Sequence, residues 1–169
     1  MILYPNMHLD KVEQITIEFL QKNKIKALIL DVDNTILDFD KKIPEGIDKW
    51  CEDLKKQGIK LCILSNTNKI EKVKRVAKEL DLQYINFAKK PSKSGFIRAM
   101  ELLELKAENM AIAGDQIMTD VLGGNRMKMF TILTKPLDKK DIFITRVKRP
   151  LENMIIKSYL RRIEKESER

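Results

Sequence analysis

The chain has 169 residues, of which 43% are hydrophobic and 34% charged, and its formal net charge is +8 at pH 7. This composition predicts one soluble globular domain with a core of its own, because no apolar run approaches the roughly 20 residues of a membrane span. The only cysteines, Cys51 and Cys62, form no C-x-x-C motif, and residues 1–9 lack the pattern of a signal peptide. We therefore expect a cytoplasmic protein without a disulfide or a zinc site.

An N-terminal arm, residues 1–24, precedes the first predicted strand. Its apolar side chains fall at helical spacing, which predicts a helix that covers part of a sheet. These side chains are Val12, Ile15, Phe19 and Leu20.

Five apolar segments of strand length follow, and helical segments alternate with them. The predicted strands are Ala27–Leu30, Ile59–Leu64, Tyr84–Phe87, Met110–Ala113 and Met129–Leu133. The alternation predicts an α/β fold, a doubly wound, Rossmann-like parallel sheet of five strands with helices on both faces. We expect residues 1–169 to form a single domain around this sheet.

Residues 150–169 form a basic segment with the pattern of an amphipathic helix. Apolar residues fall on one half of its helical wheel (Leu151, Ile155, Ile156, Tyr159, Leu160 and Ile163), and Lys157, Arg161 and Lys165 fall on the other half. From Lys135 onward, Lys and Arg exceed Asp and Glu by five charges. Such a helix is suited to an anionic membrane surface, but it is equally suited to packing on the domain with its charges in solvent. The sequence leaves both alternatives open.

Polar clusters follow four of the predicted strands. The first is Asp31-Val32-Asp33-Asn34-Thr35. Because alternate side chains of an extended segment leave on the same side, its two aspartates are expected to share one face, as in a metal site or an acid/base pair. The later clusters are Ser65-Asn66, then Lys89-Lys90-Pro91, then Gly114-Asp115 with Asp120.

Each cluster also has an ordinary structural explanation. Aspartate, asparagine and serine are common in turns, Asp120 has the position of a helix cap, and either lysine is suited to a solvated surface. The carboxyl ends of parallel strands, however, meet at one edge of a sheet, where α/β proteins bind their ligands. The four clusters are therefore expected to form one site.

The order and chemistry of these clusters resemble the four motifs of the haloacid dehalogenase superfamily of phosphohydrolases, over residues 25–134. The resemblance implies that Asp31 is the nucleophile and Asp33 the general acid and base. It also implies phosphate binding by Ser65, Asn66 and Lys90, with Lys89 as the competing lysine. A Mg²⁺ ion is expected on Asp31, on the backbone carbonyl of Asp33 and on Asp115. Thr35 and Asp120 are expected to support the site.

The spacing of the motifs leaves no room for an inserted cap domain, as in subfamily IIIA. Within that subfamily the motifs resemble the YqeG branch, which is related to the mitochondrial phosphatidylglycerophosphate phosphatase. The resemblance implies a phospholipid head group as substrate. The basic C-terminal helix would suit peripheral contact with an anionic membrane at its inner, cytoplasmic face. An open site also suits phosphorylated nucleic-acid ends or phosphoproteins. A third alternative is a binding module that keeps the fold without catalysis.

Overall fold

A computed structural model describes residues 2–38, 40–137 and 143–167. Six strands form one sheet in the order β1-β6-β5-β2-β3-β4, and every neighbouring pair is parallel. The strands are β1 (Met7–Leu9), β2 (Ala27–Leu30), β3 (Lys60–Leu64), β4 (Gln83–Ile85), β5 (Met110–Gly114) and β6 (Phe130–Thr134). The α-helices are α1 (Ile17–Lys22), α2 (Ile47–Lys56), α3 (Ile70–Glu79), α4 (Lys93–Leu103), α5 (Leu122–Met127) and α6 (Phe143–Ser167).

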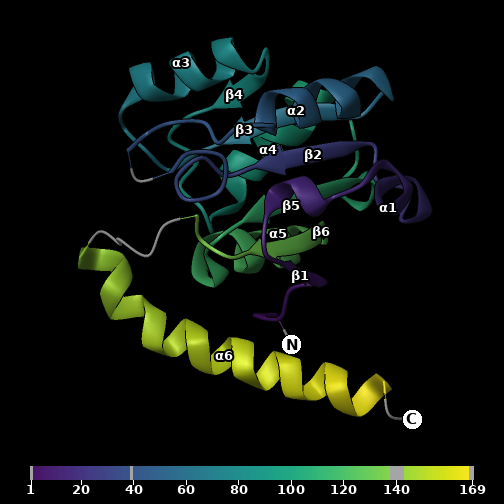
Figure 1. Cartoon of the computed structure of the whole chain (residues 1–169), viewed down its shortest axis with the longest axis vertical. Helices are drawn as coiled ribbons and strands as arrows, with labels where there is room; N and C mark the ends of the chain where they lie inside the picture. Colours follow the sequence, from purple (N-terminus) through teal and green to yellow (C-terminus); the bar gives the residue numbers. More distant parts are fainter. Residues whose placement is uncertain (1, 39, 138–142, 168–169) are drawn as a thin grey trace.

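The doubly wound fold is confirmed, but the prediction of five strands is wrong by one. The additional strand, β1, lies at the edge of the sheet beside β6 (Figure 1). Asn6, directly before β1, bonds to Thr131 of β6 and so holds the strand at this edge. The Asn6 backbone N–H donates to the Thr131 carbonyl at 2.9 Å, and the Asn6 side chain accepts from the Thr131 N–H at 2.8 Å. A three-residue edge strand whose partner lies 125 residues away leaves almost no periodic signal in the sequence.

Apolar side chains of the central strands alternate between the two faces of the sheet. In β2, Leu28 and Leu30 face the side covered by α1, α2 and α3, and Ala27 and Ile29 face α4. All four are buried, as expected of a strand covered on both faces. The predicted N-terminal helical arm is divided between a 3₁₀ turn at Val12–Gln14 and the short helix α1.

Short connections join the consecutive strands β2, β3, β4, β5 and β6. Each contains a single α-helix: α2, α3, α4 and α5 in turn, accompanied by short 3₁₀ or π turns (Figure 1). The described residues of these connections therefore form no inserted cap domain.

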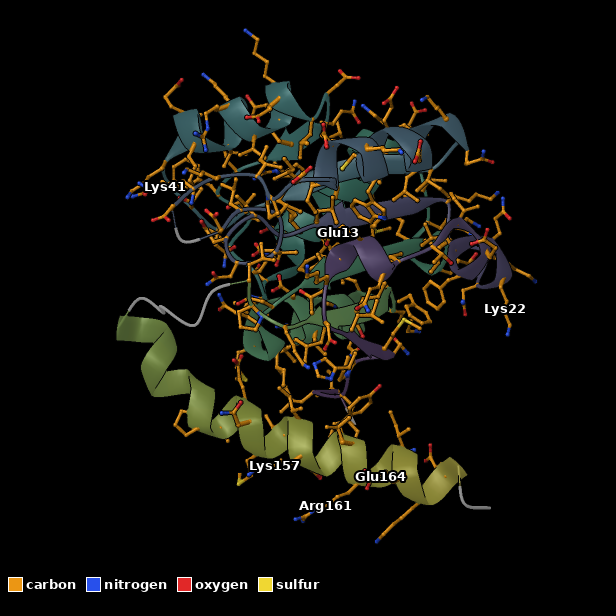
Figure 2. The ribbon with its side chains drawn as sticks, viewed as in Figure 1. Glu13, Lys22, Lys41, Lys157, Arg161 and Glu164 are labelled. Atoms are coloured by element: carbon orange, nitrogen blue, oxygen red, sulfur yellow. The ribbon has the colours of Figure 1, made fainter. Side chains whose placement is uncertain are left out.

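The C-terminal helix α6 packs on the domain through part of one face. Ile155 and Tyr159 are buried, and the Tyr159 ring meets the Tyr4 ring edge-to-face at 5.7 Å. Buried Glu152 accepts a hydrogen bond from the Met118 N–H at 3.2 Å. The basic side chains of Lys157 and Arg161 point away from the domain (Figure 2).

Packing therefore accounts for part of the apolar face of α6. Other apolar side chains of the helix remain exposed: Leu151, Met154, Leu160 and Ile163. Within the described residues, no helix is both long and apolar enough to cross a membrane.

We expect Ile155→Ala to loosen α6, because truncating a buried isoleucine removes about 2 kcal/mol or more of packing free energy. Amide hydrogen exchange in α6 should then accelerate by roughly thirtyfold. Lys157→Ala, on the outward side of the same helix, is the matched control and should leave exchange unchanged. Equal exchange in both variants would show that α6 does not depend on this contact.

Candidate active site

The predicted site residues gather where the winding of the sheet reverses direction. From β2 the chain goes to β3 on one side, and after β4 it crosses to β5, on the other side of β2. Asp31 directly follows β2, and its backbone N–H extends the ladder by donating to the Ala113 carbonyl at 2.9 Å. Asp115 directly follows β5. Reversal points of this kind form the ligand crevice of doubly wound sheets.

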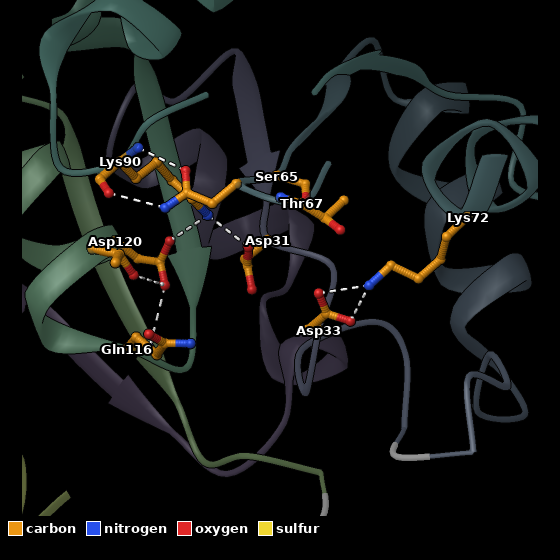
Figure 3. Close-up of polar contacts among 10 residues, drawn as sticks. Asp31, Asp33, Ser65, Thr67, Lys72, Lys90, Gln116 and Asp120 are labelled. Atoms are coloured by element: carbon orange, nitrogen blue, oxygen red, sulfur yellow. Dashed lines mark hydrogen bonds and ion pairs between the residues drawn. The ribbon is translucent and has the colours of Figure 1, made fainter. Parts of the chain in front are cut away.

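The amine of Lys90 is the centre of this site. Its Nζ lies 2.6 Å from Asp31 Oδ1 and 2.7 Å from Asp120 Oδ1, with only 2% of the side chain exposed (Figure 3). Lys89, the competing lysine, is exposed. The structure therefore places Lys90, and not Lys89, among the buried carboxylates.

The backbone that carries Lys90 is held by the turn after β3. The side-chain oxygen of Asn66 accepts from the Lys90 N–H at 2.7 Å, and its amide donates to the Lys90 carbonyl at 2.9 Å. The Ala88 N–H also donates to the Ser65 carbonyl at 3.0 Å. These bonds join two predicted clusters that lie 24 residues apart.

The carboxylate of Asp120 lies against the end of β5. Its Oδ2 accepts hydrogen bonds from the Gln116 N–H at 3.3 Å and the Thr119 hydroxyl at 3.2 Å. A Cβ on Gly114 would overlap the Asp120 carboxylate, so only glycine allows this close approach. The alternative role of Asp120 as a helix cap is wrong, because Asp120 lies inside the π-helical turn Ile117–Val121, and Gln116 and Val121 hold the N-cap positions of that turn and of α5.

Burial and the neighbouring Lys90 ammonium shift the pKa of Asp31 in opposite directions. Burial raises the pKa of its carboxyl group to about 6, an effect that the Lys90 ammonium partly counteracts and the Asp120 carboxylate reinforces. Burial alone would lower the pKa of Lys90, but the Asp120 and Asp31 carboxylates more than compensate and leave it raised. The raised pKa of Lys90 keeps its amine charged at neutral pH beside the two carboxylates.

Three buried carboxylates could together hold a cation. One oxygen from each of Asp31, Asp115 and Asp120 lies within 4.8 Å of the others. With the Lys90 ammonium beside them, the cluster carries two net negative charges. Carboxylate oxygens are the ligands that Mg²⁺ prefers, and a divalent ion would balance this charge, so the residues present fit such an ion.

Asp33 lies apart from this cluster, contrary to the expectation that its carboxylate shares a face with that of Asp31. Its side chain is 51% exposed and points toward Lys72 of α3, whose Nζ lies 2.5 and 2.7 Å from the two carboxylate oxygens (Figure 3). The chain turns directly after Asp33. Asn34 adopts a positive φ of 61°, and the backbone then folds back so that Leu37 donates to the Val32 carbonyl.

Lys72 was not identified from the sequence. Its side chain is only 13% exposed, and it lies in the first turn of α3, where the helix dipole disfavours a cation. A lysine in the first turn of a helix that follows a site motif is a weak signal. It becomes informative only once Asp33 is seen opposite.

Two hydroxyl groups complete the polar surroundings. Buried Ser65 accepts a hydrogen bond from the Thr67 N–H at 3.2 Å. The hydroxyl of Thr35 is buried and has no hydrogen-bond partner within the described part of the chain. All the predicted site residues thus lie at one edge of the sheet, but only Asp31, Lys90, Asp115 and Asp120 form a buried cluster.

We expect Gly114→Ala to lower the free energy of unfolding by roughly 1–3 kcal/mol, because the new methyl group overlaps the Asp120 carboxylate. In an Asp120→Gly background the overlap is absent, so the same substitution should have a much smaller effect. Urea titrations of the four proteins measure this difference. Equal losses in the two backgrounds would place the strain elsewhere.

Sequence similarity to known proteins indicates the family of the chain. A family model described as haloacid dehalogenase-like hydrolase matches residues 40–128, slightly more than half of the chain. The Bacillus subtilis (strain 168) protein named probable phosphatase YqeG is 38% identical over 94% of this chain and 92% of its own length. The Arabidopsis thaliana phosphatidylglycerophosphate phosphatase 1 is 25% identical over 94% of this chain, but the match covers only 48% of that protein.

Solved structures share the fold. An uncharacterized protein from Listeria monocytogenes serotype 4b aligns with a TM-score of 0.55 at 19% identity, over 70% of this chain and 85% of the other. The cobalt-bound deoxy-D-mannose-octulosonate 8-phosphate phosphatase of Haemophilus influenzae aligns with a TM-score of 0.51 at 16% identity, over 81% and 90% of the two chains. The chain therefore belongs to the haloacid dehalogenase-like hydrolases, and its predicted enzyme class, a phosphatase of this family, is confirmed.

Proposed function

We propose that this enzyme hydrolyses phosphomonoesters through an aspartyl-phosphate on Asp31. The observation that carries this proposal is the buried Lys90 ammonium, which contacts Asp31 at 2.6 Å and offers a positive charge beside the attacking carboxylate. A carboxylate held in this way is poised as a nucleophile, and an ammonium beside it would offset the charge of an incoming phosphoryl group.

Two steps follow from these assignments. An Asp31 oxygen attacks phosphorus, the bond from phosphorus to the leaving oxygen breaks, and Asp33 gives that oxygen a proton. Asp33 then takes a proton from a water molecule, which attacks the aspartyl-phosphate and releases inorganic phosphate and free Asp31. In the structure Asp33 is bound to Lys72, so its carboxyl group must leave that contact to carry a proton.

The remaining residues bind and orient the phosphoryl group. Ser65 and the backbone amides of the Ser65-Asn66 turn would donate hydrogen bonds to its oxygens, and Lys90 would balance its charge. Asp120 would keep Lys90 in place, because both of its carboxylate oxygens accept bonds from Lys90, Gln116 or Thr119. Buried Thr35 would support the turn that carries Asp33.

A Mg²⁺ ion is proposed on the carboxylates of Asp31 and Asp115 and on the backbone carbonyl of Asp33. Asp120 belongs to the same acidic cluster, but both of its carboxylate oxygens accept hydrogen bonds, Oδ1 from Lys90 and Oδ2 from Gln116 and Thr119. Lys90 contacts Asp31 through Oδ1, so we assign Asp120 the supporting role. When bound, the ion would screen the negative charges of the nucleophile and the phosphate from each other.

For the substrate we propose phosphatidylglycerophosphate at the cytoplasmic face of a membrane. The support is the similarity to the Arabidopsis enzyme, the open edge of the sheet and the outward basic side of α6. An open site accepts a phosphate that projects from a large surface, whereas a small metabolite is better enclosed by a lid. Lysines and arginines near an anionic bilayer each contribute about 1 kcal/mol of attraction.

We expect Asp31→Asn to abolish turnover without unfolding the protein, because an amide has nearly the same shape but forms no acyl-phosphate. Asp53→Asn, which changes an exposed aspartate on α2, is the matched control for Asp31→Asn and should remain active. In a separate experiment, excess chelator should stop turnover by the wild-type enzyme, and added Mg²⁺ should restore it. Full activity of a folded Asp31→Asn protein would refute the mechanism.

The same assay identifies the substrate when it is run against three phosphomonoesters. We expect phosphatidylglycerophosphate in mixed micelles to give a higher kcat/KM than a 3′-phosphorylated oligonucleotide or a phosphopeptide. A preference for either of the others would assign the open site to nucleic-acid ends or to phosphoproteins. Failure to hydrolyse all three and also p-nitrophenyl phosphate would favour a binding module.

A further inference from the structure

The side chain of Asn66 uses both ends of its amide on a single residue. Its oxygen accepts from the Lys90 backbone N–H at 2.7 Å, and its nitrogen donates to the Lys90 carbonyl at 2.9 Å. A side-chain amide has one acceptor oxygen and one donor nitrogen, so this pair of bonds engages both. From the sequence, Asn66 was expected to bind phosphate through its backbone amide, and no role was predicted for its side chain.

Two hydrogen bonds fix more than a single one does. One bond allows the Lys90 backbone to rotate about the donor–acceptor line, whereas a second bond to the same residue removes that freedom. Other bonds hold the flanking residues, from the Ala88 N–H to the Ser65 carbonyl at 3.0 Å and from the Ser92 N–H to the Lys89 carbonyl at 2.8 Å. The two bonds from Asn66 act on the Lys90 backbone itself. The Lys90 side chain then extends from this backbone to Asp31 and Asp120.

We propose that Asn66 is a positioning residue that acts through Lys90: its side chain holds the Lys90 backbone so that the ammonium reaches both carboxylates. This inference rests on the proposed role of Lys90 at the phosphoryl group. It gives the Asn66 side chain a role beside the phosphate contact predicted for its backbone amide. The backbone N–H of Asn66 takes no part in these two bonds.

The effect of Asn66 is on geometry more than on stability. Asn66 is itself exposed, so in a truncated variant water can reach the Lys90 backbone groups and satisfy their hydrogen bonds. A mobile water molecule cannot fix the orientation of the backbone. A displacement of about 1 Å at an active site can lower the rate by about a hundredfold. Loss of the two Asn66 hydrogen bonds should therefore reduce turnover while the protein stays folded.

A double-mutant cycle on kcat tests the proposal, with p-nitrophenyl phosphate as a reactive substrate. Asn66→Ala should lower kcat by about ten- to a hundredfold in the otherwise unchanged enzyme. In a Lys90→Met background, where no ammonium remains to be positioned, it should lower kcat by less than about twofold. Asn68→Ala, an exposed asparagine two residues further along the same turn, is the matched control and should retain full activity.

Equal factors in the two backgrounds would overturn the proposal, because Asn66 would then act independently of Lys90, as it would if its side chain bound phosphate directly. A second measurement needs no turnover and applies if Lys90→Met is inactive or unfolded. In ¹⁵N-labelled protein the buried Lys90 ammonium should give a slowly exchanging NMR signal. Asn66→Ala should broaden or remove this signal, and Asn68→Ala should preserve it. An unchanged signal in Asn66→Ala would contradict the proposed positioning role of Asn66.

The two measurements separate this inference from the proposed function. If Asn66→Ala loses the ammonium signal but the wild-type protein hydrolyses no phosphomonoester, the positioning role of Asn66 stands and the proposed reaction is refuted. If the wild-type protein is an active phosphatase and Asn66→Ala alters neither kcat nor the ammonium signal, only the positioning role of Asn66 is refuted.

Discussion

The structure of the site depends on one buried cation, the ammonium of Lys90, shared between Asp31 and Asp120. Removing an ammonium and its carboxylates from water is unfavourable, and such groups contribute little to stability compared with well-packed apolar side chains. Removal of one member, in contrast, leaves a buried charge without its partner. The arrangement is therefore better explained by what it does at the site, where it holds a nucleophilic carboxylate close to a positive charge.

The fold brings these three residues together from distant parts of the sequence. Asp31 follows β2, Lys90 lies between β4 and α4, and Asp120 lies between β5 and α5. Close approach is possible because Gly114 has no side chain where Asp120 lies and because Asn66 holds the Lys90 backbone. The central sheet provides the common edge, and these two contacts set the distances of a few ångströms on which chemistry depends.

The sequence was sufficient for the sheet and for most of the cluster, because both follow from local patterns. Buried strands appear as short apolar runs, and the polar residues at their carboxyl ends meet wherever the strands are parallel. The missed features all depend on partners distant in sequence. The edge strand β1 is held through Asn6 and Thr131, and the Asp33 carboxylate is paired with Lys72 of α3, 39 residues away. The double contact of Asn66 has no periodic signal at all.

Chemical trapping of the phosphoenzyme tests the central claim most directly. Enzyme quenched during turnover is treated with borohydride, which reduces an aspartyl-phosphate to homoserine, and the peptides are then mapped by mass spectrometry. Our account predicts homoserine at position 31 and unmodified aspartate at positions 33, 115 and 120. Modification at any of these three positions, or turnover without modification at position 31, would contradict it.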